Sequence, residues 1–183
     1  MIPAGPHNRT FGELGWDSKK AIVNIRDADS TDRKFLESMF VEAALWDPSM
    51  PRQPLEALLL VPRLSRYVGD WGRPSDVALI ADAGDECLGA AWYRFFSSTE
   101  PGYGFVDESI PELGIAVLPR SRGQSTGTAL LKALMERARA ARCSGLSLSV
   151  AATNPARHLY ERHGFVKVGE VGSSWTMVVR FSS

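Results

Sequence analysis

The sequence of 183 residues predicts an α/β fold: a mixed, partly antiparallel central sheet of about six to seven strands, flanked by about four helices. Segments that alternate apolar and polar residues, as half-buried strands do, are interspersed with segments whose apolar residues recur at helical spacing. Two pairs of strand-like segments are separated by short turns that contain Gly, which indicates antiparallel hairpins. The length suits one core, so we expect residues 21–183 to form a single domain after a loose segment, residues 1–20, rich in Gly, Pro and polar groups.

Capping residues and prolines delimit the elements of the first half of the chain. Asp29, Ser30 or Thr31 can cap the first helix, and the prolines that follow end one helical segment and start the next. The polar turn 82–85 joins two strands as a hairpin. The expected elements are a strand at 21–26, a helix from about 30 to 45, helical segments at 54–60 and 63–68, and strands at 77–81 and 87–96.

The second half begins with a loop, residues 97–111, whose length is typical of functional loops in compact domains. Further on, Asn154 and Pro155 suit the start of a short helix and Gly164 suits its end. The expected elements are a central strand at 112–118, a helix to about 142, a strand at 146–150, a short helix at 155–163, and a hairpin of strands at 165–171 and 175–181.

The stretch from Arg122 to Leu131 joins the expected central strand to the helix that follows it. A polar, Gly-containing turn that opens a helix directs several backbone N–H groups to one point, where the helix dipole adds partial positive charge. Gly123 and Gly127 let the backbone approach an anion with no Cβ in the way, and Arg122 adds a permanent charge. The stretch therefore predicts a pyrophosphate site. It is not a P-loop, because it has no lysine, and it lacks the three spaced glycines of a dinucleotide fingerprint.

Instead, the stretch resembles the acetyl-CoA signature of the GNAT superfamily of N-acetyltransferases, Arg/Gln-x-x-Gly-x-Gly/Ala. Arg122 and Gly127 match this signature, whereas Ser125 stands where the family usually has its first glycine. A second stretch, residues 154–165, resembles the family's segment Asn-x-Ala-x-x-x-Tyr-x-x-x-Gly-Phe, with Tyr160 at the tyrosine position. The two stretches occur in the family's order and spacing.

The resemblance implies the GNAT fold and transfer of the acetyl group of acetyl-CoA to a primary amine of a small molecule or a protein. It implies that backbone N–H groups of the central strand, that of Val117 first among them, bind pantetheine and the developing oxyanion. It also implies that Tyr160 protonates the departing thiolate; without the motif, Tyr160 would be a packing residue on a helix. The residues implied to bind acetyl-CoA are Ile115, Ala116, Val117, Leu118, Arg122, Gly123, Gln124, Ser125, Thr126, Gly127, Thr128, Asn154 and Tyr160.

Carboxylates near the central strand are candidates for attracting and deprotonating the amine. Glu112, at the entry of the strand, is our candidate general base. In a regular strand it shares a face with Gly114 and Ala116, whose small size would leave room for a ligand. The alternative is a charged residue at a strand end that pairs with an arginine. The candidates for the substrate site, equally compatible with solvated loop charges or core aromatics, are Tyr103, Asp107, Glu108, Trp46 and Trp71.

Composition excludes several classes of function. Basic and acidic residues balance at 21 each, so the formal net charge is zero, which argues against a nucleic-acid partner or an anionic membrane surface. We find no stretch with the apolar length of a membrane span or a signal peptide. Two cysteines without metal-site spacing, and no HExxH motif, lead us to expect no metal and a cytoplasmic location.

Two functions fit the sequence. The first is an acetyl-CoA-dependent N-acetyltransferase whose partners are acetyl-CoA and an amine; a homodimer is compatible with the sequence. The second is a non-catalytic acyl-CoA sensor that keeps the phosphate site without turnover. Tyr160 favours turnover, and Ser125 favours an altered cofactor geometry.

Overall fold

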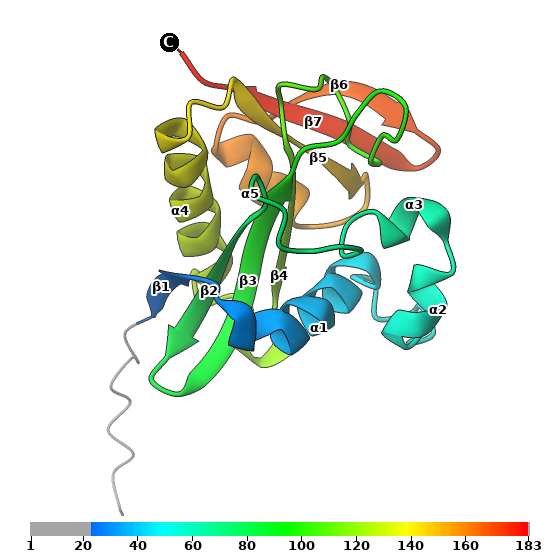
Figure 1. The fold of residues 1–183 in the computed structure, drawn as a ribbon. Helices are drawn as coiled ribbons and strands as arrows, with labels where there is room; N and C mark the ends of the chain where they lie inside the picture. The colour runs from blue at the N-terminus through cyan, green and yellow to red at the C-terminus, as the bar shows by residue number, and fades with distance from the viewer. Residues whose placement is uncertain (1–22, 183) are drawn as a thin grey trace, which may run out of the picture.

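The computed structural model describes residues 23–182, so the expected loose segment 1–20 and the start of the first expected strand lie outside the described residues. Within that range the chain forms a mixed sheet in the order β1-β2-β3-β4-β5-β7-β6 (Figure 1). Every neighbouring pair is antiparallel except β4 and β5, which are parallel. The strands are β1 Asn24–Asp27, β2 Val77–Ala83, β3 Glu86–Arg94, β4 Glu112–Val117, β5 Gly145–Ala151, β6 Val166–Val171 and β7 Ser174–Arg180. This confirms the expected fold class.

The helices follow the capping and proline signals closely. Asp29 caps the first helical turn, as expected, and its side chain accepts from the Thr31 N–H group. Pro54 precedes α2, and Pro62 is the first residue of α3, where its missing N–H group is no loss. The helical elements are η1 Ser30–Asp32, α1 Arg33–Ala44, α2 Leu55–Leu59, α3 Pro62–Ser65, η2 Pro119–Ser121, α4 Thr126–Ala140 and α5 Arg157–Arg162.

Two hydrophobic cores lie on opposite faces of the sheet, because side chains alternate along each strand. On β3, Ala91 and Tyr93 belong to the core that α4 covers, whereas Ala90 and Trp92 belong to the core that α1 covers. Figure 1 shows α1, α2 and α3 following one another along one side of the sheet, away from α4. Below, these are called the α4 core and the α1 core.

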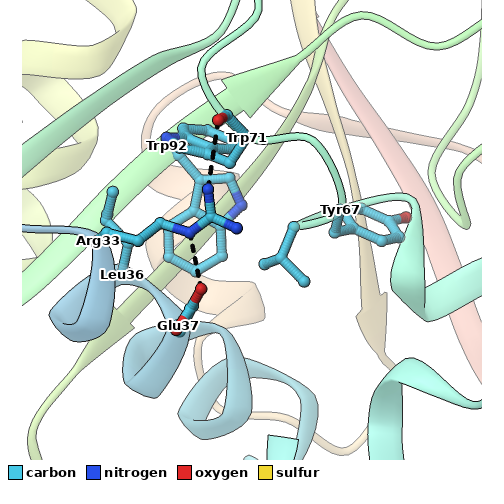
Figure 2. Close-up of a pocket in the computed structure, with 7 residues that line it drawn as sticks. Arg33, Leu36, Glu37, Tyr67, Trp71 and Trp92 are labelled. Atoms are coloured by element: carbon cyan, nitrogen blue, oxygen red, sulfur yellow. Dashed lines mark hydrogen bonds and ion pairs between the residues drawn. The ribbon is translucent and has the colours of Figure 1, made fainter. Parts of the chain in front are cut away.

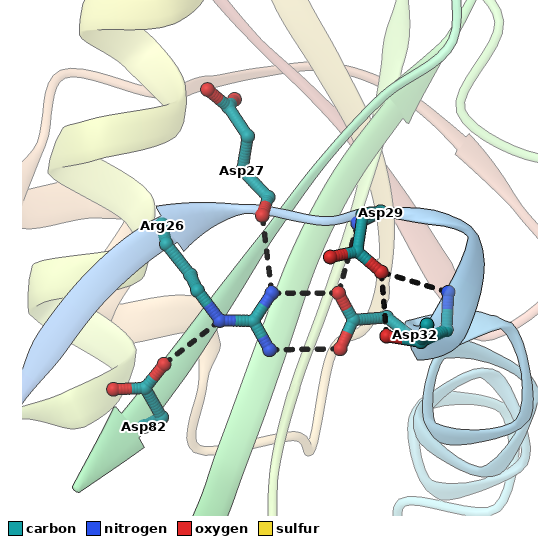
Figure 3. A network of polar contacts seen from close by, with 6 residues as sticks. Arg26, Asp27, Asp29, Asp32 and Asp82 are labelled. Atoms are coloured by element: carbon teal, nitrogen blue, oxygen red, sulfur yellow. Dashed lines mark hydrogen bonds and ion pairs between the residues drawn. The ribbon is translucent and has the colours of Figure 1, made fainter. Parts of the chain in front are cut away.

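An ion-pair network fixes the start of α1 to the edge of the sheet (Figure 3). The Arg26 guanidinium on β1 donates two hydrogen bonds to Asp32, at 2.7 and 2.8 Å, and a third to Asp82 on β2 at 3.0 Å. Asp32 also accepts from the N–H group of Asp29 at 2.9 Å, which completes a capping box. The hydrogen bonds from Arg26 hold the pKa of Asp32 below its usual range. The network therefore fixes the position of α1 over the α1 core.

A buried ion pair fixes the chain between α3 and β2. Arg94, at the end of β3, donates two hydrogen bonds to Asp76, at 2.9 and 2.6 Å, and both side chains are almost completely buried. A further N–H group of Arg94 donates to the carbonyl groups of Arg66 and Gly69, at 2.6 and 2.7 Å. The guanidinium thus satisfies its hydrogen-bonding capacity inside the protein, as a buried charge requires.

Replacing Asp76 with Ala should lower the free energy of unfolding by about 3–5 kcal/mol, because it leaves the buried Arg94 charge unpaired. Chemical denaturation of both proteins measures the difference. Glu86→Ala is the matched control: it breaks an ion pair with Arg120 in which both side chains are 59% exposed, and it should change stability by about 1 kcal/mol or less. If Asp76→Ala lowers the free energy of unfolding by no more than Glu86→Ala does, the buried pair does not have the stabilising role described here.

Candidate active site

A cleft opens between the two parallel strands at the centre of the sheet. β4 and β5 pair at a single position, Glu112 with Ser147, where the N–H group of Ser147 donates to the carbonyl of Pro111 at 3.0 Å. Beyond it, β4 stays paired with β3 along its whole length and β5 with β7, so the two strands diverge. The cleft has a volume of about 960 Å³, and residues 112–117 and 148–151 line its two sides.

The diverging strands direct backbone N–H groups into the cleft. The N–H group of Leu118 donates to Leu88 on β3 at 2.9 Å, so strand alternation turns the N–H group of Ala116 to β3 as well. The N–H groups of Ile115 and Val117 face the opposite edge, which borders the cleft. Of the four residues expected to offer backbone donors, two are therefore oriented for it.

The predicted phosphate site lies at the beginning of α4. The first hydrogen bond within this helix runs from the N–H group of Ala129 to the carbonyl of Ser125 at 3.0 Å, so the N–H groups of Thr126, Gly127 and Thr128 are not used in the helix ladder. We call Arg122–Thr128 the phosphate cradle.

The packing of the protein does not require a glycine at position 127. A Cβ atom on Gly127 would meet Leu159 and Val117 only at ordinary contact distances of 3.7 Å, so the chain itself has room for a side chain there. Gly127 also lines the cleft. A glycine that packing does not require, beside free N–H groups at a helix start, fits the close approach of a phosphate.

Ser125 occupies a backbone conformation that suits glycine. Its φ of 68° and ψ of 0° lie in the left-handed region, and its side chain makes no capping hydrogen bond. For a non-glycine residue this conformation costs about 1–2 kcal/mol. The structure thus explains why the family's signature has a glycine here.

Arg122 connects the cradle to the rest of the cleft. Its Nε donates to the carbonyl of Val117 at 3.1 Å, and its Nη2 lies 2.5 Å from Glu42 on α1. The other oxygen of Glu42 pairs with Arg52 at 2.9 Å. The sequence does not indicate this role of Glu42, because 80 positions separate it from Arg122 and no local pattern marks it.

Tyr160 and Asn154 both line the cleft. Tyr160, on α5, is 6% exposed and packs edge-to-face on Phe165, with ring centroids 5.8 Å apart. Burial raises the pKa of Tyr160, so the phenol stays protonated. The side-chain oxygen of Asn154 accepts from the N–H group of Ala156 at 2.9 Å. The helix begins only at Arg157, with Ala156 at its N-cap, so Asn154 closes the preceding turn and is not the N-cap that we expected.

Glu112 is a buried carboxylate that makes no hydrogen bond to a basic side chain within residues 23–182, although the charge of Arg63 acts on it. One oxygen accepts from the hydroxyl of Tyr67 at 2.6 Å and from the N–H group of Gly104 at 2.8 Å. The hydroxyl of Tyr67 in turn accepts from the N–H group of Tyr103 at 2.6 Å. The second oxygen, Oε2, is buried beside Gly102 and has no hydrogen-bond partner within the described part of the chain. Burial raises the pKa of Glu112 to about 7.

The expectation that Gly114 leaves room for a ligand is wrong. The indole of Trp92, opposite Gly114 on β3, fills that space: a Cβ atom on Gly114 would lie 2.5–2.7 Å from its ring atoms. The indole Nε1 is buried without a partner among the described residues. Trp92 therefore forms part of the cleft surface beside Glu112, and sequence analysis missed it because the strand register was unknown.

The candidates for the substrate site divide into two groups. Trp46 and Tyr103 line the cleft. Asp107 and Glu108 do not: they are exposed and accept hydrogen bonds from Ser109 and Ser98 of their own loop. These bonds lower the pKa of both carboxyl groups. The structure thus leaves Glu112 as the predicted carboxylate that borders the cleft.

Trp71 lies at a separate small cavity, shown in Figure 2. Its ring packs under the guanidinium of Arg94 at 5.0 Å, and its carbonyl accepts from Arg33 at 3.3 Å. The cavity volume of about 10 Å³ is room for about one water molecule. This cavity is too small for a substrate, so Trp71 is a packing residue.

A comparison of the sequence with protein families agrees with this geometry. The model of the Acetyltransferase (GNAT) family matches residues 27–165, and the chain belongs to this family. It is therefore an acetyl-CoA-dependent acyltransferase, as the resemblance of its sequence implied. A comparison of the sequence with curated proteins returns no significant match. Within residues 23–182 no helix is long and apolar enough to cross a membrane, and no group of three His, Cys, Asp or Glu side chains is arranged to hold a metal.

Solved structures agree with the fold. The PaiA N-acetyltransferase of Thermoplasma acidophilum, in complex with coenzyme A, has a TM-score of 0.64 at 16% identity, over 87% of this chain and 99% of that one. A ribosomal-protein-alanine N-acetyltransferase of Brucella melitensis has a TM-score of 0.64 at 23% identity, over 86% and 99%. YncA of Salmonella typhimurium, a putative acetyltransferase with acetyl-CoA, has a TM-score of 0.61 at 19% identity, over 86% and 93%.

Gly127→Glu should bind acetyl-CoA roughly tenfold or more weakly, because its side chain places bulk and a negative charge beside the N–H groups that a phosphate would approach. Gly127→Ala should keep its affinity, since the family's signature also has alanine at this position, and it should be at least as stable as the parent because its Cβ has room. Calorimetric titration with acetyl-CoA and thermal unfolding measure the two effects.

The matched control for Gly127→Glu is Gly169→Glu on β6, where a new Cβ likewise meets its neighbour, Thr176, at 3.7 Å. Gly169 does not line the cleft, so its variant should keep the parent affinity. Unchanged affinity in Gly127→Glu would move the phosphate site elsewhere.

Proposed function

We propose that this acyltransferase is an N-acetyltransferase, which transfers the acetyl group of acetyl-CoA to a primary amine. The observation that carries the proposal is the environment of Glu112: a buried carboxylate with a pKa of about 7 and one free oxygen, in the cleft that also contains Tyr160 and the phosphate cradle. An amine in its ammonium form must lose a proton before it can attack, and a base poised near neutral pH suits that task. Two of the similar structures are of proteins named N-acetyltransferases.

In this proposal each group has one role. The phosphate cradle binds the pyrophosphate of acetyl-CoA, Asn154 binds its pantetheine arm, and the N–H group of Val117 stabilises the developing oxyanion. Tyr160 donates a proton to the departing thiolate. Glu112 lies about 16 Å from Val117 along an extended strand, so it accepts the amine's proton through water or from an amine that extends toward it.

The second candidate is the acyl-CoA sensor, which Ser125 favours because a strained serine replaces the family's glycine in the cradle. Two measurements separate the candidates: the thermal shift with acetyl-CoA, and thiol release from acetyl-CoA over a panel of primary amines. Thiol release with any amine supports the enzyme. Binding of acetyl-CoA without release for any amine favours the sensor.

Tyr160→Phe should bind acetyl-CoA normally, because it removes only a hydroxyl group, and should turn over roughly ten- to a thousandfold more slowly. Thiol-release kinetics and a titration with acetyl-CoA measure the two quantities. Tyr93→Phe is the control: Tyr93 is equally buried in the α4 core but does not line the cleft, so this variant should keep its activity. Full activity in Tyr160→Phe would leave Tyr160 as a packing residue.

Glu112→Gln should lose most of its activity near neutral pH and regain part of it at high pH, where the free amine accumulates. In the parent, the base is active when deprotonated, so kcat/KM should rise with pH through about 7. The pH–rate profiles of the two proteins test this expectation. A pH–rate profile of Glu112→Gln that matches the parent's would show that a group other than Glu112 accepts the proton of the amine.

Stability gives an independent check on the same group. The folded-state pKa of Glu112 is raised from 4.5 to about 7, so its contribution to stability is present below pH 4.5 and is lost as the pH rises through 7. Glu112→Gln removes this loss. Between pH 5 and pH 8 the variant should therefore gain stability relative to the parent, by up to about 3 kcal/mol. A stability difference that does not change with pH would contradict the raised pKa.

A further inference from the structure

The residues that line the side of the cleft away from α4 indicate which chemical class of ligand fits there. The cleft passes through the sheet between β4 and β5, so it is lined from both cores. On the α1 side, the lining comes from α1, the loop after it, α2 and α3. We call this part the acceptor arm; among its lining side chains are Phe40, Leu45, Trp46, Met50, Leu58 and Leu64.

The acceptor arm has almost no charge available for a ligand. In the part of the chain that the structure describes, the charged residues that line the whole cleft are Glu42, Glu112 and Arg122. Both oxygens of Glu42 are already paired, one with Arg122 and one with Arg52. Glu112 is therefore the carboxylate of the cleft lining that is in no ion pair, and it lies at the end of the arm where β4 and β5 meet. It is 3% exposed and the Arg63 cation lies near enough to lower its pKa, so it can attract one ammonium group at most.

Apolar side chains at the entrance of the arm are exposed to solvent. Met50 and Val61 both line the cleft and are 44% and 41% exposed. Large apolar groups left in water at a concave site gain about 25 cal/mol for each square ångström that a ligand covers. The entrance thus favours an apolar surface on the molecule that enters, while the inner end offers one carboxylate.

We infer that the acceptor is a monoamine: one primary amine on an apolar, aliphatic or aromatic body. This inference rests on the proposed function and adds the substrate class to it. The amine is directed to Glu112, and the apolar body lies along Trp46, Met50 and Leu58. A diamine or polyamine would bring a second ammonium group into the arm, where it would lose its hydration without gaining a carboxylate.

The experiment compares hexylamine with 1,6-diaminohexane, which have the same carbon chain and differ by one terminal amine. At pH 8 both amines of the diamine are protonated in solution, because alkyl amines have a pKa above 10. The value of kcat/KM from thiol release should be roughly tenfold or more higher for hexylamine. An equal or higher value for 1,6-diaminohexane overturns the inference.

A charge introduced at the entrance should shift this preference. Met50→Glu places a carboxylate on a half-exposed side chain, and Met50→Gln is its uncharged control of similar shape. The glutamate variant should raise kcat/KM for the diamine relative to hexylamine, whereas the glutamine variant should not. The same ratio in both variants would show that the second ammonium group does not lie in the arm, which also overturns the inference.

The outcomes separate this inference from the proposed function. Absence of thiol release with every amine, in a protein that binds acetyl-CoA, contradicts the acetyltransferase proposal. Binding of the two amines to the protein saturated with coenzyme A then decides the substrate class, by calorimetric titration. Tighter binding of hexylamine supports the monoamine arm, and tighter or equal binding of the diamine rejects it.

Discussion

The whole site depends on how β4 and β5 divide their hydrogen bonds. Each strand is fully paired with an antiparallel neighbour on its outer side, and the two meet each other at one residue pair. Their inner edges are therefore left open over the remaining length, and an open strand edge presents N–H and C=O groups that need partners. A mostly antiparallel sheet with one incomplete parallel pair thus creates, from backbone alone, an elongated site that can bind an extended ligand such as the pantetheine arm of acetyl-CoA.

The position of the carboxylate follows from the same point in the sheet. Glu112 lies where the two strands meet, and Gly102 of the long loop covers it because Gly102 has no side chain to exclude that contact. A Cβ on Gly104 would collide with the backbone of Leu148 and Ser149 on β5, so a glycine there lets the N–H group of Gly104 reach the carboxylate. Tyr67, whose own pKa is raised by burial, stays protonated and donates to the carboxylate. One oxygen of Glu112 accepts two hydrogen bonds, whereas Oε2 is buried and has no partner among residues 23–182, which leaves it with unused acceptor capacity.

Signals within a few residues were sufficient for most of the fold, and they also supplied the candidate residues of the site that are local in sequence. The cap at Asp29, the prolines before α2 and α3, both hairpins, the phosphate cradle and Tyr160 are all local patterns. The contacts that local patterns miss are mostly long-range. Glu42 and Tyr67 reach their partners across 80 and 45 positions, and Trp92 covers Gly114 through a strand register that no local pattern encodes. Asp107 and Glu108 bind serines of their own loop, which a count of carboxylates could not distinguish from a substrate site.

The pairing of Arg122 with Glu42 connects the two ends of the cleft. Glu42 belongs to α1, and α1 also forms one side of the acceptor arm, so the guanidinium that faces the cradle is held by the helix that faces the acceptor. In the proposed complex, a phosphate that engages Arg122 would compete with Glu42 for the same N–H groups and weaken that tie. By thermodynamic linkage such an effect is reciprocal: whatever the donor does to the acceptor's affinity, the acceptor does to the donor's by the same factor. The proposed enzyme would then couple the affinities for its two substrates through one ion pair that neither substrate needs for its chemistry.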